Sequence, residues 1–113
     1  MSAAPARFAS DGRGYDTRNC VGVTKEAAME KLGVIGGMGA EATSYYYDQV
    51  VRHTAATCDQ EHIDMVVLSK STMPDRTLAI KTGEHAELLA TMKECAQALE
   101  TLGCAHIAIP CNT

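Results

Sequence analysis

Cys111 is the residue of this sequence whose side chain is the best candidate for taking part in a reaction. It follows Pro110 and the apolar stretch Ala105–Ile109, and it precedes Asn112 and Thr113. Asn and Thr are good N-cap residues, so a helix is predicted to begin here, after a strand. The amino end of a helix stabilises a thiolate, which can act as a nucleophile or as a base. The alternative for Cys111 is a buried, inert cysteine, a common fate for this residue type.

A glycine-rich loop, Gly36 to Ala42, joins an apolar stretch to a predicted helix. Its glycines allow positive φ and close approach of a ligand, and N–H groups at the helix start favour an anion. The loop also matches the G-x-G-x-x-A pattern of dinucleotide-binding proteins. That pattern is weak alone, and Ser69-Lys70 stand where an acid would hold the ribose. A tight turn and an anion site therefore stay open, with a dinucleotide site less favoured.

Arg76 is the third candidate, in the loop Pro74-Asp75-Arg76-Thr77. The guanidinium presents a rigid fork of donors that can hold a carboxylate through two hydrogen bonds. The alternative is a surface arginine that pairs with Asp75 or Glu84 and contributes little.

Apolar stretches and helical patterns alternate along the part of the chain that must position these residues. Strands are predicted over 32–36, 63–68 and 105–109, and helices over 41–57, from Pro74 to Gly83, and over 84–102, with Gly103 as the C′ residue. The resulting order, β-α-β-α-α-β, predicts an α/β fold with a parallel sheet and flanking helices. Ligands of such sheets bind at the carboxyl ends of the strands, where all three candidate loops begin.

Two helical faces are marked by apolar spacing. Tyr47, Val50, Val51 and Thr54 follow the i, i+3, i+4, i+7 pattern of the first helix. The last helix repeats apolar residues at three- and four-residue steps: Leu88, Met92, Cys95 with Ala96, Leu99 and Leu102.

Composition narrows the class of protein. The chain has 113 residues, 46% hydrophobic and 21% charged, which predicts one small globular domain. A net charge of −4 disfavours nucleic acid and anionic membranes as partners. Five cysteines without a CxxC pair favour a reduced, cytoplasmic setting. The four histidines lack metal-binding spacing, so no metal site is predicted.

Residues 1–28 differ from the rest, being rich in Ala, Ser, Gly and Arg without periodicity. They are predicted to form a disordered tail or an over-extended N-terminus, with Met29 as the physiological start. Intact-mass analysis of the natively expressed protein tests this, because a mass that includes 1–28 contradicts the later start.

Three stretches together resemble the aspartate/glutamate racemase family, with matching order and spacing. They are Leu32–Thr43, Met73–Thr77 and Ile109–Thr113. The resemblance covers residues 31–113 and implies the first half of a fold with two similar α/β halves facing each other across a cleft. It also implies proton transfer at the α-carbon by two cysteines, one from each half, without pyridoxal phosphate or a metal.

The same resemblance assigns roles to individual residues. Cys111 matches the first catalytic cysteine, Met38 in the Gly37–Gly39 loop matches a substrate-contacting position, and Arg76 matches a carboxylate-binding position. Asn112 and Thr113 match the residues that hold the α-carboxylate. The implied substrate is an amino acid of the aspartate or glutamate type.

Two residues depart from the family pattern, and the match covers one half only. Ala40 replaces a proline, and Lys70 stands where a small polar residue is common, which bears on substrate preference. A second half with the second cysteine is expected beyond Thr113, with a homodimer as the full-length form. Residues 1–113 alone are expected to be inactive and marginally stable. A non-catalytic relative that binds a dicarboxylic amino acid stays open as an alternative.

Overall fold

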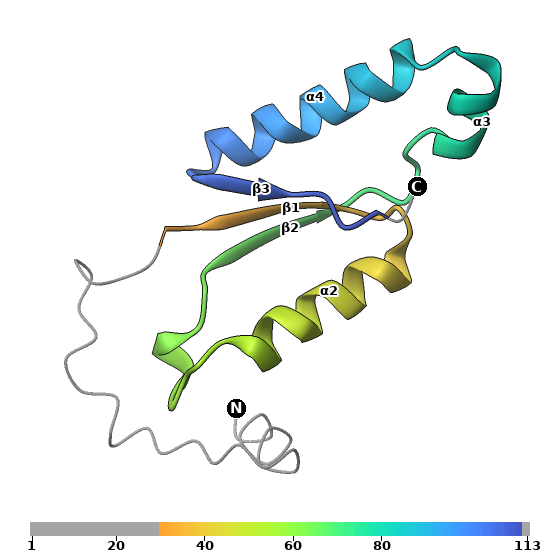
Figure 1. Ribbon diagram of the computed structural model, residues 1–113. Helices are drawn as coiled ribbons and strands as arrows, with labels where there is room; N and C mark the ends of the chain where they lie inside the picture. The colour runs from red at the N-terminus through yellow and green to blue at the C-terminus, as the bar shows by residue number, and fades with distance from the viewer. Residues whose placement is uncertain (1–29, 112–113) are drawn as a thin grey trace.

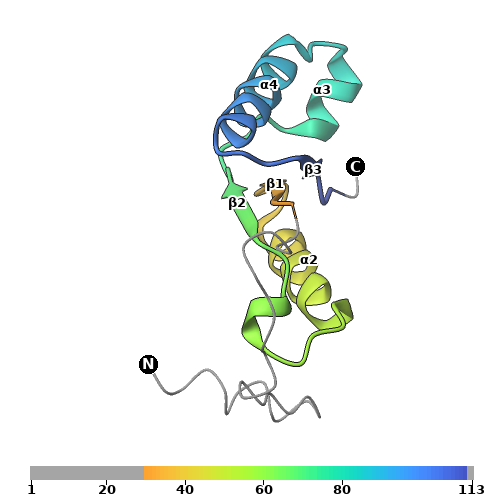
Figure 2. The same ribbon diagram turned by 90° about the vertical axis from the view of Figure 1, so that its left-hand side faces the viewer.

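A computed structural model describes residues 30–111, which form a three-stranded parallel sheet between helices (Figure 1). The elements in chain order are β1 (Leu32–Gly36), α2 (Ala40–His53), the 3-10 helix η3 (Asp59–Glu61), β2 (Met65–Ser69), α3 (Arg76–Thr82), α4 (Ala86–Thr101) and β3 (His106–Ala108). The strand order is β2-β1-β3. Helix α2 covers one face of the sheet, and α3 and α4 lie on the other (Figures 1 and 2). The predicted α/β class and parallel sheet are confirmed.

The predictions for residues 1–28 and for a start at Met29 fall outside the described residues, and they stay predictions. Within residues 30–111, no helix combines the length and apolarity needed to cross a bilayer.

The central strand β1 is the best-buried element because helices cover it on both faces. Gly33 pairs with Val66 of β2 and with Ile107 of β3. Val34 is 0% exposed and lies next to Ile35, which is 2% exposed. Both neighbouring strands are edge strands, and Ile107 is 40% exposed. The sheet is therefore completely covered only along its middle.

The main core lies between the sheet and α4. Its buried members are Ile35, Met38, Met73, Cys95 and Leu99. We call these five residues the core cluster. A Cβ at Gly33 would lie 3.0 Å from the Cys104 sulfur and 3.1 Å from Leu99 of α4, so glycine lets the helix pack closely on β1. Leu102, predicted on the same helical face, is instead 53% exposed because the helix ends at Thr101.

Helix ends differ from the predicted bounds for local reasons. Helix α2 ends at His53 rather than at residue 57. The next residue, Thr54, adopts an extended backbone, and its hydroxyl donates to the Val50 carbonyl. Helix α3 begins at Arg76 rather than at Pro74, because the Asp75 carboxylate caps it by accepting the Leu78 N–H.

The predicted glycine stops are confirmed at both other helix ends. Gly83 closes α3 with a left-handed φ of 75°. Gly103 follows α4 with a φ of 85°, and its N–H donates to Glu100 while the Cys104 N–H donates to Leu99. This pair of hydrogen bonds forms a Schellman motif, which satisfies carbonyls at the helix end and turns the chain into β3.

One cysteine departs from the expected reduced state. Cys58 is fully buried and disulfide-bonded. The other described cysteines, Cys95, Cys104 and Cys111, are thiols.

The loop after β1 depends on one glycine. Gly37 has a φ of 94°, and a Cβ atom there would collide with the backbone of Lys70, whose nitrogen would lie 2.6 Å away. Gly39 has an ordinary φ of −98° and open space where a Cβ would point. Only Gly37 is therefore required by the close approach of two loops.

We expect Gly37→Ala to lower the free energy of unfolding by more than about 2 kcal/mol, through strain at positive φ and the backbone collision. Urea denaturation followed by circular dichroism measures this effect. Gly39→Ala is the matched control and is expected to cost about 1 kcal/mol or less. Equal losses in the two variants would contradict this role of Gly37.

Asp75 provides a test of the start of α3. The Leu78 N–H holds the pKa of the Asp75 carboxyl below its ordinary 3.8, with smaller contributions from Thr77, Arg76 and Lys81. A lowered folded-state pKa means that this stabilisation is complete above pH 3.8 and is lost as pH falls through the folded value.

We therefore expect Asp75→Ala to lower the melting temperature at pH 7 and to have a smaller effect near pH 2. Asp75→Asn keeps a capping side chain and is expected to lose less stability at pH 7. Thermal melts of the three proteins at both pH values measure this. A pH-independent cost of Asp75→Ala would contradict the capping by the ionised carboxylate.

Candidate active site

Three loops meet at the carboxyl edge of the sheet (Figure 1). They follow β1, β2 and β3, and they carry the glycine loop, Arg76 and Cys111 respectively. The first two are joined directly, because the Lys70 N–H donates to the Gly36 carbonyl at 3.0 Å. Parallel pairing of all three strands thus brings the three predicted loops to one edge.

Cys111 lies at a surface hollow and also contacts the interior. Its half-buried side chain packs against the core cluster, which contains Met38 and Met73. It also lines a hollow of about 280 Å³ beside the first turns of α2. The other lining residues are Ala42, Tyr45, Tyr46, Gln49 and Pro110. Cys111 is therefore accessible at the edge of the sheet, rather than enclosed in the core.

Met38, which was predicted to contact the substrate, is buried. It is 2% exposed and belongs to the core cluster against which Cys111 packs. The structure thus places Met38 in the same apolar environment as the Cys111 side chain. Any contact between the Met38 side chain and a ligand would be made from the floor of the site.

The N–H of Gly37 is already committed within the protein. It donates to the Thr43 hydroxyl at 2.8 Å, and that hydroxyl donates to the Gly39 carbonyl at 3.1 Å. The donors that remain for an anion are the N–H groups of the first turn of α2, which begins at Ala40. The first N–H groups of a helix have no hydrogen-bond partner within that helix. The glycines shape the loop more than they supply donors.

Thr43 is a structural residue of the site that sequence reasoning did not single out. It is 5% exposed, and its methyl carbon would lie 2.5 Å from a Cβ at Gly36. One side chain thus occupies the space over Gly36 and ties Gly37 to Gly39. The available signal was a threonine in the first helical turn, four residues after Gly39, where a hydroxyl can bond back to a carbonyl.

Arg76 is half-buried at the first position of α3. Its Nη1 donates to the Pro74 carbonyl at 3.3 Å, whereas its Nε is buried and has no hydrogen-bond partner. Among residues 30–111 it forms no ion pair, so the alternative of a surface pair with Asp75 or Glu84 is not observed. Buried donors are normally paired, so this arginine has unused capacity for an anion.

The remaining site predictions lie elsewhere or outside the description. Asn112 and Thr113 are not among the described residues. Cys95 is buried within α4, and Cys104 precedes β3 at the opposite edge of the sheet, packed against Gly33. Of the thiols in residues 30–111, only Cys111 follows the carboxyl end of a strand.

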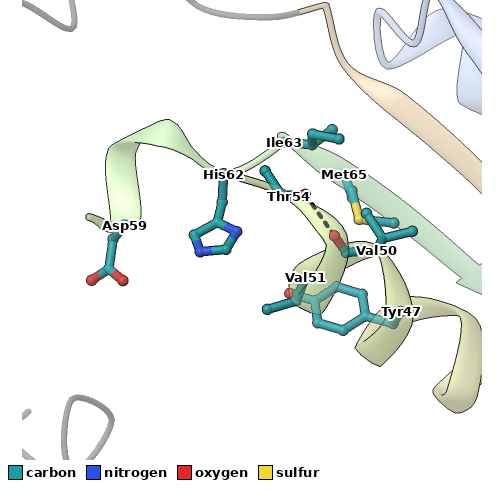
Figure 3. A pocket seen from close by; sticks show the side chains of 8 residues that line it. All are labelled: Tyr47, Val50, Val51, Thr54, Asp59, His62, Ile63 and Met65. Atoms are coloured by element: carbon teal, nitrogen blue, oxygen red, sulfur yellow. Dashed lines mark hydrogen bonds between the residues drawn. The ribbon is translucent and has the colours of Figure 1, made fainter. Parts of the chain in front are cut away.

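A second hollow lies away from this edge, between α2 and the segment leading into β2 (Figure 3). It measures about 230 Å³ and is mostly apolar, with Asp59 and His62 among its lining residues. Its lining includes Tyr47, Val50, Val51 and Thr54, the residues that the helical pattern had placed on one face of α2. It shares no residue with the Cys111 site. Across the described segment, no group of three or more His, Cys, Asp or Glu residues could hold a metal ion.

Comparison with protein families agrees with this geometry. The family model for Asp/Glu/hydantoin racemases matches residues 35–113, from the end of β1 through the last residue. The match contains the glycine loop, Arg76 and Cys111, and it confirms the family that the three sequence stretches resemble. The chain belongs to the Asp/Glu/hydantoin racemase family.

Proposed function

We propose that this protein is an amino-acid racemase of the aspartate/glutamate type, in which Cys111 removes or returns the α-proton. The observation that carries the proposal is an accessible Cys111 thiol at the carboxyl edge of the sheet, on the edge that also carries Arg76. Family membership supports a racemase-type activity on a small amino-acid substrate. The preferred amino acid and the role of each residue are part of the proposal.

The chemistry explains why these residue types belong together. The α-proton of an amino acid is very weakly acidic, so the carbanion formed on its removal needs stabilisation. For a mechanism without a cofactor, as the family resemblance implies, this comes from donors directed at the carboxylates and from exclusion of water. Arg76 supplies a guanidinium for one carboxylate, and Asn112 with Thr113 is proposed to hold the α-carboxylate.

Inversion also requires a second acid on the opposite face of the α-carbon. A single base tends to return the proton to the face from which it came. Cys95 is buried in the core cluster, and Cys104 packs against Gly33 near the opposite edge of the sheet. We therefore assign the second thiol to a residue outside 30–111, in a second, similar half facing this one, and we expect the full-length protein to be a homodimer.

In the full-length protein, we expect Cys111→Ser to abolish α-proton removal from one enantiomer of the substrate, because serine is a far weaker acid than cysteine. The loss should be at least about a hundredfold, which is the usual contribution of a positioned acid or base. Loss of the α-proton signal of L- and D-aspartate in D₂O, followed by proton NMR, measures it.

Cys104→Ser is the matched control, because this thiol lies at the opposite edge of the sheet. Its exchange rates should equal those of the unsubstituted protein. Unchanged exchange in Cys111→Ser would refute Cys111 as the base. Aspartate binding without any exchange in the unsubstituted protein would favour a non-catalytic binding relative instead.

Residues 1–113 on their own are expected to give no net racemisation, because only one thiol of the described part lies at the site. Chiral chromatography of L- and D-aspartate after prolonged incubation measures this. Inversion at a rate proportional to the concentration of this chain would contradict the need for a second base from elsewhere.

A further inference from the structure

Two half-buried basic residues lie at the carboxyl edge of the sheet: Lys70 directly follows β2, and Arg76 is the first residue of α3. Neither forms an ion pair with any residue of the described segment. The Nε of Arg76 is buried without a hydrogen-bond partner. Burying a polar donor without a partner costs free energy, so the Arg76 Nε calls for an explanation.

The position of Lys70 is fixed by its backbone. Its N–H donates to the Gly36 carbonyl at 3.0 Å, and its carbonyl accepts the Met73 N–H at 3.2 Å. Its backbone also packs against Gly37 so closely that no side chain fits there. Lys70 is therefore held directly against the glycine loop, not at the tip of a mobile turn.

The pleat of β2 places Lys70 toward the same side as the core cluster. Val66 and Leu68 pack against that cluster, whereas Met65 lines the hollow beside α2. Side chains alternate between the two faces of a strand. Continued by one step past Ser69, the alternation gives Lys70 the face of Leu68, which is also the face against which Cys111 packs.

Nearby carboxylates do not neutralise these cations. Asp75 is exposed, and its carboxylate accepts the Leu78 N–H as the cap of α3. Glu41 is exposed in the first turn of α2 and forms no ion pair within residues 30–111. The edge that carries the Cys111 thiol thus holds two positive charges whose partner is absent from the described protein.

We propose that Lys70 is a specificity-determining residue, which with Arg76 makes the site select amino acids that carry two carboxylates. The inference rests on the proposed function and adds a residue and a discriminating charge to it. Arginine can hold one carboxylate in a planar fork, while lysine offers a compact charge on a flexible stem for the other. A monocarboxylic amino acid would leave one cation unpaired, which is a strong basis for rejection.

The test is a titration of the ¹⁵N-labelled full-length protein with L-aspartate and with L-alanine, followed by NMR chemical shifts. Lys70→Met should weaken aspartate binding about tenfold or more, the usual effect of losing a charged hydrogen bond. Alanine binding should change less than about twofold. Lys70→Arg should keep most of the aspartate affinity, and Lys93→Met, an exposed site in α4, should match the unsubstituted protein.

Lys70→Gln serves as a second neutral variant, and circular dichroism confirms that each variant is folded. Equal aspartate affinity in the unsubstituted protein and in either folded neutral variant would overturn the inference. The proposed function would stand in that case if Cys111-dependent exchange of aspartate is observed. Parallel weakening of aspartate and alanine would also overturn it, because that pattern indicates a structural role for Lys70.

Discussion

The close contact between the loops after β1 and β2 is the constraint on which the site depends. The Lys70 N–H reaches the Gly36 carbonyl, and Gly37 leaves room for the Lys70 backbone. Thr43 then fixes the other side of the glycine loop through the Gly37 N–H and the Gly39 carbonyl. These contacts hold the first turn of α2 and the start of the segment leading to Arg76 in a fixed relation to each other. The loop is rigid because both of its sides are bonded.

Parallel pairing of the strands also positions the loops that carry the site residues. A β2-β1-β3 order places the central strand between the two strands whose ends carry Arg76 and Cys111. Burial is concentrated in β1 and α4, so the glycine loop extends from the best-packed part of the molecule. The edge strands and several apolar side chains, such as Leu89 and Ile109, stay exposed. The site is therefore supported by the best-packed part of the molecule, and exposed apolar surfaces that another protein segment could cover lie beside it.

The fold was predictable from sequence to the extent that periodic apolar patterns and glycine stops determine it. The three strands, the long helix α4 and the ends at Gly83 and Gly103 follow from residue types and spacing. Single-residue effects set the boundaries instead: the extended backbone of Thr54 ends α2 early, and the Asp75 carboxylate starts α3 late. The site was only partly predictable. Loop residues could be assigned to one edge, but the burial of Met38 and the use of the Gly37 N–H by Thr43 depend on three-dimensional contacts.

Protection of thiols from alkylation tests most directly whether Cys111 lies at the substrate site. The full-length protein would be treated with iodoacetamide with and without L-aspartate, and peptide mass spectrometry would follow the modification of each cysteine. We predict that aspartate slows the alkylation of Cys111 and leaves that of Cys104 unchanged. Alkylation of Cys111 at the same rate with and without saturating aspartate would contradict the account.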